Sequence, residues 1–99
     1  MVTHIVVFTW LPGATAAQVE NLGQALTALA AQMRGNAVIR HGADLGFRDG
    51  NGDYALVATF ADRDDWDSYQ ADPRHKAFVR DHVTPIQAAR LTVQFHHDD

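Results

Sequence analysis

The chemically suggestive residues of this sequence are centred on His75. Asp72 and Pro73 are typical of a helix start, as N-cap and first helical residue, and this places His75 in the first turn. Amides exposed at a helix N-terminus, together with the helix dipole, favour the neutral imidazole that a general base needs. Phe78 and Val79 follow on the same side of the helix. A neutral base beside apolar side chains suits proton abstraction next to a carbonyl, which contributes about 10²–10⁴-fold to a rate.

Two further side chains are candidates to complete a site with His75. Tyr69 lies six residues earlier, and a helix that stops and restarts at Asp72–Pro73 can turn both side chains into one cleft. A phenol there would orient the imidazole or polarise a substrate carbonyl. His4 lies on a predicted strand, on the same side as Val6, and would be the second polar group of the pocket. The predicted catalytic residues are therefore His75, Tyr69 and His4.

Each of these residues also has a structural interpretation that the sequence leaves open. His75 can hydrogen-bond a backbone carbonyl and fix its helix, and His4 can be a hydrogen-bonded core histidine. Tyr69 can be a core aromatic residue with its hydroxyl at the rim. A pocket and a core use the same apolar residue types. The apolar walls of a substrate site between sheet and helices are predicted to include Leu26, Phe60, Trp66 and Phe78.

Neither a metal site nor a cofactor site is predicted. His75 and His82 are two helical turns apart, about 10 Å along the axis, which is too far to share one metal ion. The tail His96–Asp99 contains metal-binding residue types but is expected to fray. The chain has no cysteine, so thiolate ligands and thiol nucleophiles are excluded. It also contains no GxGxxG, P-loop, nucleophile-elbow or HExxH motif.

The elements that must position these side chains follow from the apolar pattern. Segments rich in β-branched and aromatic residues predict strands, and apolar residues at spacings of three and four predict helices. Thr15 and Gln18 form a capping box, and Asp62 can cap the next helix. The predicted strands cover residues 2–10, 37–47, 53–61 and 89–96, with hairpin signals at 48–52, and the predicted helices cover 15–34, 62–71 and 73 to a stop at Pro85.

The resulting order, βαββαβ, predicts an α+β domain with ferredoxin-like topology. Its four-stranded antiparallel sheet carries the helices on one face, with the first and third strands in the centre. Those two strands are apolar on both sides, as expected for strands covered on both faces. The last strand alternates, with Leu91, Val93 and Phe95 on one side and polar residues on the other, which predicts a half-solvated edge.

A sheet with helices on one face leaves a second apolar face open. Patches of that size are rare on monomers, and a twin sheet from a second copy would cover this one. The sequence therefore predicts a homodimer through the open sheet face, which is a dimeric α/β barrel. The alternative is a monomer in which polar and small residues dilute that face, namely His4, Thr9, Ala58 and Thr59.

Composition narrows the classes of partner. The 99 residues suit one domain, and the net charge is −4 with only eight Lys and Arg residues. Nucleic acids and anionic membranes are therefore poor partners, because their binding depends on basic side chains. The apolar run Ile5–Trp10 is too short to cross a bilayer or to serve as a signal core, so we expect a cytoplasmic protein.

Three segments resemble one known family, the stress-responsive A/B barrel (Dabb) domain. They are His4–Phe8 followed by Leu11–Gly13, Asp53–Val57, and residues 69–79. The last segment is the most specific, because it resembles the family pattern Tyr-x-x-His/Asp-Pro-x-His-x-x-Phe. The resemblance extends over essentially the whole chain and implies a single Dabb domain over residues 1–99.

The resemblance also implies a type of chemistry. One branch of the family contains the plant polyketide cyclases of the olivetolic acid cyclase type, which need no cofactor. They close an aromatic ring from a linear poly-β-keto thioester by an aldol reaction. By position, the resemblance implies that His75 is the catalytic base and that Tyr69 and His4 shape the site. Where that branch has a pocket tyrosine, this chain has Leu26.

Three functional hypotheses remain open at this stage. The first is a cofactor-free cyclase or lyase that acts on a hydrophobic, polyketide-like or β-keto substrate through a histidine base. The second is a non-catalytic, stress-associated dimer that binds a hydrophobic small molecule. The third is a cofactor-free monooxygenase of the related dimeric α+β barrel type, which would consume oxygen.

Overall fold

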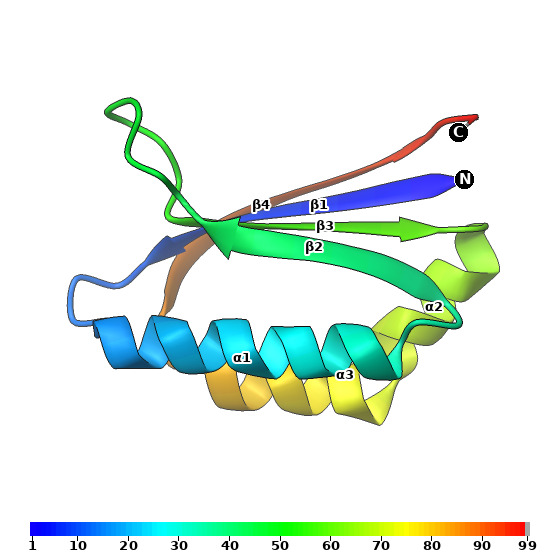
Figure 1. Ribbon diagram of the computed structural model, residues 1–99, viewed down its shortest axis with the longest axis horizontal. Coiled ribbons are helices and arrows are strands. Elements are labelled where there is room, and N and C mark those ends of the chain that lie inside the picture. Colours follow the sequence, from blue (N-terminus) through cyan, green and yellow to red (C-terminus); the bar gives the residue numbers. More distant parts are fainter. Residues whose placement is uncertain (99) are drawn as a thin grey trace.

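The computed structural model describes residues 1–98 and shows one antiparallel sheet whose helices all lie on the same side (Figure 1). The strands are arranged in the order β2-β3-β1-β4. The ferredoxin-like fold and its two central strands are therefore confirmed. The elements, in chain order, are β1 (Val2–Trp10), α1 (Ala16–Gln32), β2 (Ala37–Ala43), β3 (Tyr54–Phe60), α2 (Arg63–Ala71), α3 (Pro73–Phe78), the π-helical turn η1 (Val79–Val83) and β4 (Gln87–His96).

The first helix begins and packs as its sequence predicts. Thr15 Oγ1 accepts a hydrogen bond from the Gln18 amide at 3.1 Å, and Gln18 Oε1 accepts one from the Thr15 amide at 2.9 Å. These two bonds satisfy amides that have no partner inside the helix. One face of α1 then supplies the core with Leu22, Leu26 and Leu29, all buried.

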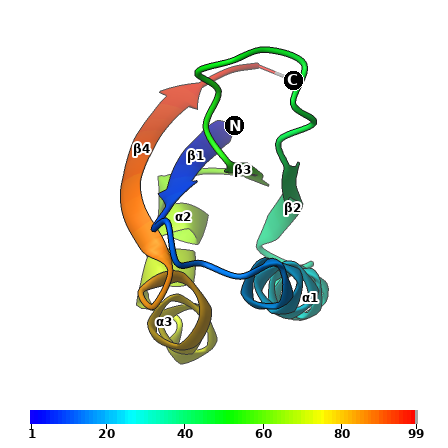
Figure 2. The same cartoon turned by 90° about the vertical axis from the view of Figure 1, so that its left-hand side faces the viewer.

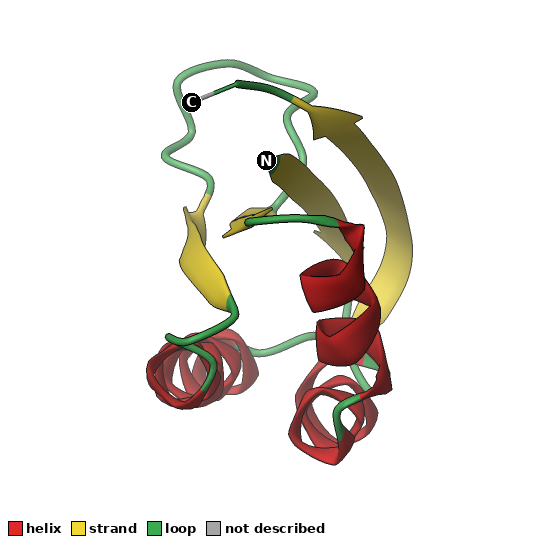
Figure 3. Cartoon of the chain, turned by 90° about the vertical axis from the view of Figure 1, so that its right-hand side faces the viewer, coloured by secondary structure: helices red, strands yellow, loops and turns green. Residues whose placement is uncertain are grey.

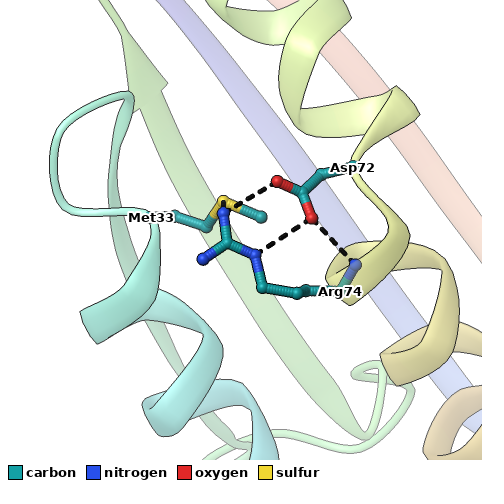
Figure 4. Close-up of polar contacts among 3 residues, drawn as sticks. All are labelled: Met33, Asp72 and Arg74. Atoms are coloured by element: carbon teal, nitrogen blue, oxygen red, sulfur yellow. Dashed lines mark hydrogen bonds and ion pairs between the residues drawn. The ribbon is translucent and has the colours of Figure 1, made fainter.

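The break between α2 and α3 is built around Asp72. Asp72 ends α2 and caps α3, because its Oδ1 accepts a hydrogen bond from the Arg74 amide at 2.8 Å. Arg74 Nη2 lies 2.8 Å from Asp72 Oδ2 and 3.7 Å from Met33 Sδ, which connects the break to the end of α1 (Figure 4). The Arg74 side-chain hydrogen bonds are the main reason that the pKa of Asp72 falls to about 2.

The second strand is shorter than predicted. It ends at Ala43 rather than at residue 47, and residues 44–53 form a loop that projects on the side of the sheet away from the helices (Figure 1). Asp44 starts this loop, because its side chain accepts hydrogen bonds from the Gly46 amide and from Asn51 Nδ2, both at 3.0 Å. Gly46 and Gly50 have φ angles of 74° and 84°, which suit glycine best.

The helix that starts at Pro73 also differs from the prediction. It is α-helical only to Phe78 and continues as the π-helical turn η1, so the spacing of its side chains changes. His82 stacks on Phe78, with 6.0 Å between the ring centroids. The last strand begins at Gln87, two residues before the predicted start.

The two faces of the sheet have opposite environments. The face toward the helices is closed by the core, in which Val6, Phe8, Leu56 and Phe60 are buried. His4 and Ala58 also lie on this side, so they do not dilute the open face, and that part of the monomer alternative is wrong. Thr9 and Thr59 belong to the opposite set of positions.

The two rows of side chains on the edge strand β4 face the sides opposite to those predicted. Its apolar row lies on the open face, where Leu91, Val93 and Phe95 are 79%, 51% and 47% exposed. Its polar row points to the helices, where Gln94 contacts His4. The strand starts beside α3 and curves away from it toward the end of the sheet where the chain termini lie (Figure 2). No helix within residues 1–98 is long and apolar enough to cross a membrane.

The exposed apolar row of β4 generates a prediction about assembly. We expect the protein to sediment as a dimer and Leu91→Glu to sediment as a monomer, because the new carboxylate would be buried without a partner. That cost is about 3 kcal/mol, or a hundredfold in Kd. The measurement is sedimentation velocity at micromolar concentration. Ala31→Glu, on the exposed side of α1, is the matched control and should remain dimeric. A monomeric wild-type protein would contradict the prediction.

Candidate functional site

A cavity of about 280 Å³ lies between the inner face of β1 and β4 and the helical layer of α2, α3 and η1. Figure 3 shows these elements from the end of the sheet at which the chain termini lie. Apolar side chains from β1, β3 and the helices form part of the wall. The principal polar side chains of the wall are His4, Tyr69, His75, Arg90, Thr92 and Gln94.

The structure brings the three predicted catalytic side chains together at this cavity. His4 comes from β1, Tyr69 from α2 and His75 from α3, and all three contribute to the wall. Trp66 and Phe78, two of the predicted substrate-binding residues, line it as well. The other two do not, because Leu26 (0% exposed) and Phe60 (1%) are enclosed in the core.

Tyr69 is buried between two rings in the wall of the site. It is 1% exposed and packs between Phe60, at a centroid distance of 5.3 Å, and His75, at 4.2 Å. Burial raises the pKa of Tyr69 to about 12, because the phenolate would lose its hydration. Tyr69 therefore remains a protonated phenol, and its hydroxyl can donate a hydrogen bond at any pH near neutrality.

His75 is half-buried, and its surroundings favour the neutral ring. Burial is the main cause that lowers its pKa below 6.5, and the charge of Arg90 lowers it further. The Gln70 backbone carbonyl and the Asp72 carboxylate act in the opposite direction. The sequence analysis, which argued from the helix start, therefore predicted the correct direction of the His75 pKa shift, but its main cause is burial. Nδ1 of His75 is buried and has no well-formed hydrogen bond within residues 1–98.

His4 is held by two donors on one ring nitrogen. Gln94 Nε2 lies 2.9 Å from His4 Nδ1, and Trp66 Nε1 lies 3.4 Å from the same atom. An indole N–H only donates, so Nδ1 is the acceptor and the proton of neutral His4 is on Nε2. The pKa of His4 is lowered, first by burial and then by the nearby His75 and Arg90. Both histidines of the site are therefore neutral near pH 7.

Sequence reasoning missed the contribution of β4. It took the polar row of this strand as the solvent side, whereas Arg90, Thr92 and Gln94 form one wall of the cavity. A signal was available in the predicted topology. The last strand must pair with the first in antiparallel order, and the register places Gln94 directly opposite His4.

The cavity has an unusual charge composition for an acidic protein. Among residues 1–98, Arg90 is the only formally charged side chain in its wall, and neither Asp nor Glu lines it. Within residues 1–98, no three His, Asp or Glu side chains are grouped as metal ligands. Asp99, the last residue of the predicted C-terminal tail, lies outside the described residues.

A second polar cluster lies between α1 and the β2-β3 edge, away from this cavity. His41 Nδ1 lies 2.7 Å from the Tyr54 hydroxyl, and His41 Nε2 lies 3.0 Å from Thr27 Oγ1. Burial raises the pKa of Tyr54 and lowers that of His41. The three side chains satisfy one another, so we interpret the cluster as a connection between helix and sheet.

The ferredoxin-like sheet and its uncovered apolar face are typical of dimeric α+β barrel proteins. Residues 2–97 match the family model described as the stress responsive A/B barrel domain, Dabb. The chain therefore belongs to the stress-responsive A/B barrel (Dabb) family. No curated protein shows significant similarity to it.

Several solved structures share the fold. A dimeric ferredoxin-like protein of unknown function from Thermobifida fusca YX is 37% identical, with a TM-score of 0.88 over 95% of this chain and 88% of that chain. A Dabb family protein from Mesorhizobium loti is 20% identical, with a TM-score of 0.79 and coverage of 99% and 97%. Hydroxynitrile lyase from Passiflora edulis is 17% identical, with a TM-score of 0.83 and coverage of 99% and 94%. The description of the Thermobifida fusca protein as dimeric supports a homodimer.

The buried neutral histidines generate a prediction about stability and pH. Since the pKa values of His4 and His75 are lowered from 6.5 in the folded state, the unfolded chain binds more protons below that pH. The free energy of unfolding should therefore fall as the pH is lowered from about 7.5 to about 5.5. Urea unfolding at a fixed protein concentration measures it.

Variants test the source of this pH dependence. His4→Gln should show a shallower fall of the unfolding free energy with decreasing pH. The control is His96→Gln, at the exposed end of β4, which should keep the wild-type dependence. Equal slopes for His4→Gln and wild type would contradict the assignment.

Proposed function

We propose that the protein is a cytoplasmic, homodimeric enzyme that needs no cofactor and catalyses a cyclase or lyase reaction on a hydrophobic carbonyl compound. In this proposal His75 is the general base, and Tyr69 and His4 are the hydrogen-bond donors. The observation that carries it is a neutral, half-buried imidazole packed on a protonated phenol in the wall of a cavity.

The two nitrogens of His75 have different surroundings, which suggests the tautomer that acts. Nδ1 is buried, so a substrate in the cavity cannot reach it. We assign the proton of neutral His75 to Nδ1, facing the Gln70 backbone carbonyl that raises its pKa. Nε2 then carries the free electron pair and is the atom that removes a proton.

The reaction follows from these protonation states. Nε2 of His75 takes a proton from a carbon next to the substrate carbonyl, and the electron pair of the C–H bond moves to the carbonyl oxygen as an enolate. Tyr69 and His4 Nε2–H donate hydrogen bonds to that oxygen, where the negative charge develops. In a cyclase, the enolate carbon then attacks a second carbonyl of the same molecule, and protonated His75 returns the proton to the resulting alkoxide.

The size and lining of the cavity limit the substrate. A volume of about 280 Å³ lies just below the usual range for ligand pockets, which suits a small molecule better than a long chain. Trp66 and Phe78 add flat, apolar surface for a ring or a short acyl group. The resemblance to the olivetolic acid cyclase type and the fold shared with the Passiflora hydroxynitrile lyase suggest two test substrates, a poly-β-keto thioester and a hydroxynitrile.

The central experiment replaces His75. We expect His75→Ala to lower turnover of the accepted substrate by about 10²–10⁴-fold while the dimer persists. In the wild type, kcat/KM should rise with pH and level off, with its midpoint below 6.5 because burial lowers the pKa of His75. Product formation is followed by chromatography across this pH range.

Tyr69→Phe is the matched variant, because it removes one hydroxyl and keeps the packing against Phe60. We expect a loss of about 10²-fold in kcat with the pH midpoint unchanged. A His75→Ala protein as active as wild type would contradict the proposal. Oxygen consumption with a quinol-like substrate in an oxygen electrode would favour the monooxygenase alternative, and substrate binding without turnover would favour the non-catalytic one.

A further inference from the structure

The polar row of β4 places one cation in the wall of the cavity. Arg90 pairs with Phe8 of β1, four residues before Gln94 on the same side of the strand. Its side chain shares the cavity wall with His4 and His75. The charge of Arg90 acts on the pKa of both histidines, so the guanidinium lies within electrostatic range of both rings.

Within residues 1–98, Arg90 is the one arginine that lies in the wall of this cavity, and it forms no ion pair. Arg63, Arg74 and Arg80 each form an ion pair with an aspartate, at 3.3, 2.8 and 2.8 Å. Arg34, Arg40 and Arg48 are exposed, as Arg90 is, and form no ion pair within residues 1–98, but they lie outside the wall of this cavity. Within residues 1–98, Arg90 has no carboxylate partner, and no acidic side chain shares its cavity. Arg90 therefore presents an unpaired guanidinium in the cavity wall, where it can bind an anion supplied from outside the chain.

The chemistry of a guanidinium selects the kind of anion. Its planar array of N–H donors matches the two oxygens of a carboxylate and binds them in a bidentate arrangement. The other polar groups of the cavity are neutral and serve the carbonyl in the proposed reaction. A ligand that uses the whole site therefore carries a carboxylate for Arg90 and a carbonyl for His75 and Tyr69.

We propose that the substrate of this cavity is an oxo acid, bound by its carboxylate to Arg90 with the reacting carbonyl beside His75. This inference rests on the proposed function, since it names the substrate class of the same site. It also has a consequence for the base. A bound carboxylate neutralises the charge that disfavours protonated His75, so the substrate itself makes the imidazole a stronger base.

A binding experiment tests the carboxylate separately from catalysis. The probes are benzoate and benzamide, which have similar shape and differ in charge, and neither can react. Binding is followed by the fluorescence of Trp66 in a Trp10→Phe background, because Trp66 lines the cavity and Trp10 does not. We expect benzoate to bind at least tenfold more tightly than benzamide and to lose affinity as the salt concentration rises.

Variants test whether Arg90 causes the preference for benzoate over benzamide. Arg90→Gln should bind the two probes equally, and Arg90→Lys should retain part of the preference. The control Arg34→Gln, in the exposed turn that follows α1, should behave as wild type. Equal affinities in the wild type, an unchanged preference in Arg90→Gln, or tighter binding of inorganic phosphate than of benzoate would each overturn the inference.

The same probes distinguish the two proposals. His75→Ala should keep the preference for benzoate, because the base does not hold the carboxylate. If wild type prefers benzoate but His75→Ala loses no activity, the general-base proposal fails and the anion site stands. If His75→Ala is inactive but wild type shows no preference for benzoate, the anion site fails and the general-base proposal stands.

Discussion

The geometry of the site depends on the hydrogen bonds that Asp72 makes at the junction of two helices. A continuous helix would place residues 69 and 75 about 120° apart around its axis, because six residues correspond to about 600° of rotation. Asp72 ends α2 and starts α3 at a new angle, and the Tyr69 and His75 rings then meet at 4.2 Å. The ion pair with Arg74 and the contact with Met33 connect this angle to the end of α1. Asp72 thus determines the angle between the two helices and does not itself line the cavity.

Burial supplies the second condition for the proposed chemistry. The pKa shifts of His4, His75 and Tyr69 have desolvation as their main cause. A single environment therefore keeps two imidazoles neutral and a phenol protonated, which gives one acceptor and two donors with no carboxylate in the cavity wall among residues 1–98. The nearest cation, Arg90, acts in the same direction on both histidines. A site of this kind can do acid–base chemistry near neutral pH with uncharged groups.

Much of the fold follows from local sequence, and the remainder depends on long-range packing. The capping box at Thr15 and the restart at Asp72 use hydrogen bonds within three residues, so residue types alone predict them. The end of β2 was missed because Asp44 closes a loop whose other side is Asn51. The π-helical turn after Phe78 was missed because apolar spacing does not distinguish it from an α-helix over so few residues. At the site, types and spacing indicated His4, Tyr69 and His75, but which side of β4 faces them is decided only by the assembled sheet.

The two rows of side chains on β4 limit the insertions and deletions that this strand can tolerate. Odd-numbered positions, such as Leu91 and Val93, form the uncovered apolar face, and even-numbered positions, such as Arg90 and Gln94, form the cavity wall. Inserting or deleting one residue in the middle of the strand would exchange the two rows beyond that point. A guanidinium or an amide would then lie on the apolar face, and a leucine or valine would lie against the histidines. The length of β4 can therefore change only in steps of two residues. Inserting or deleting a single residue would disrupt both the apolar face used for dimerisation and the wall of the cavity.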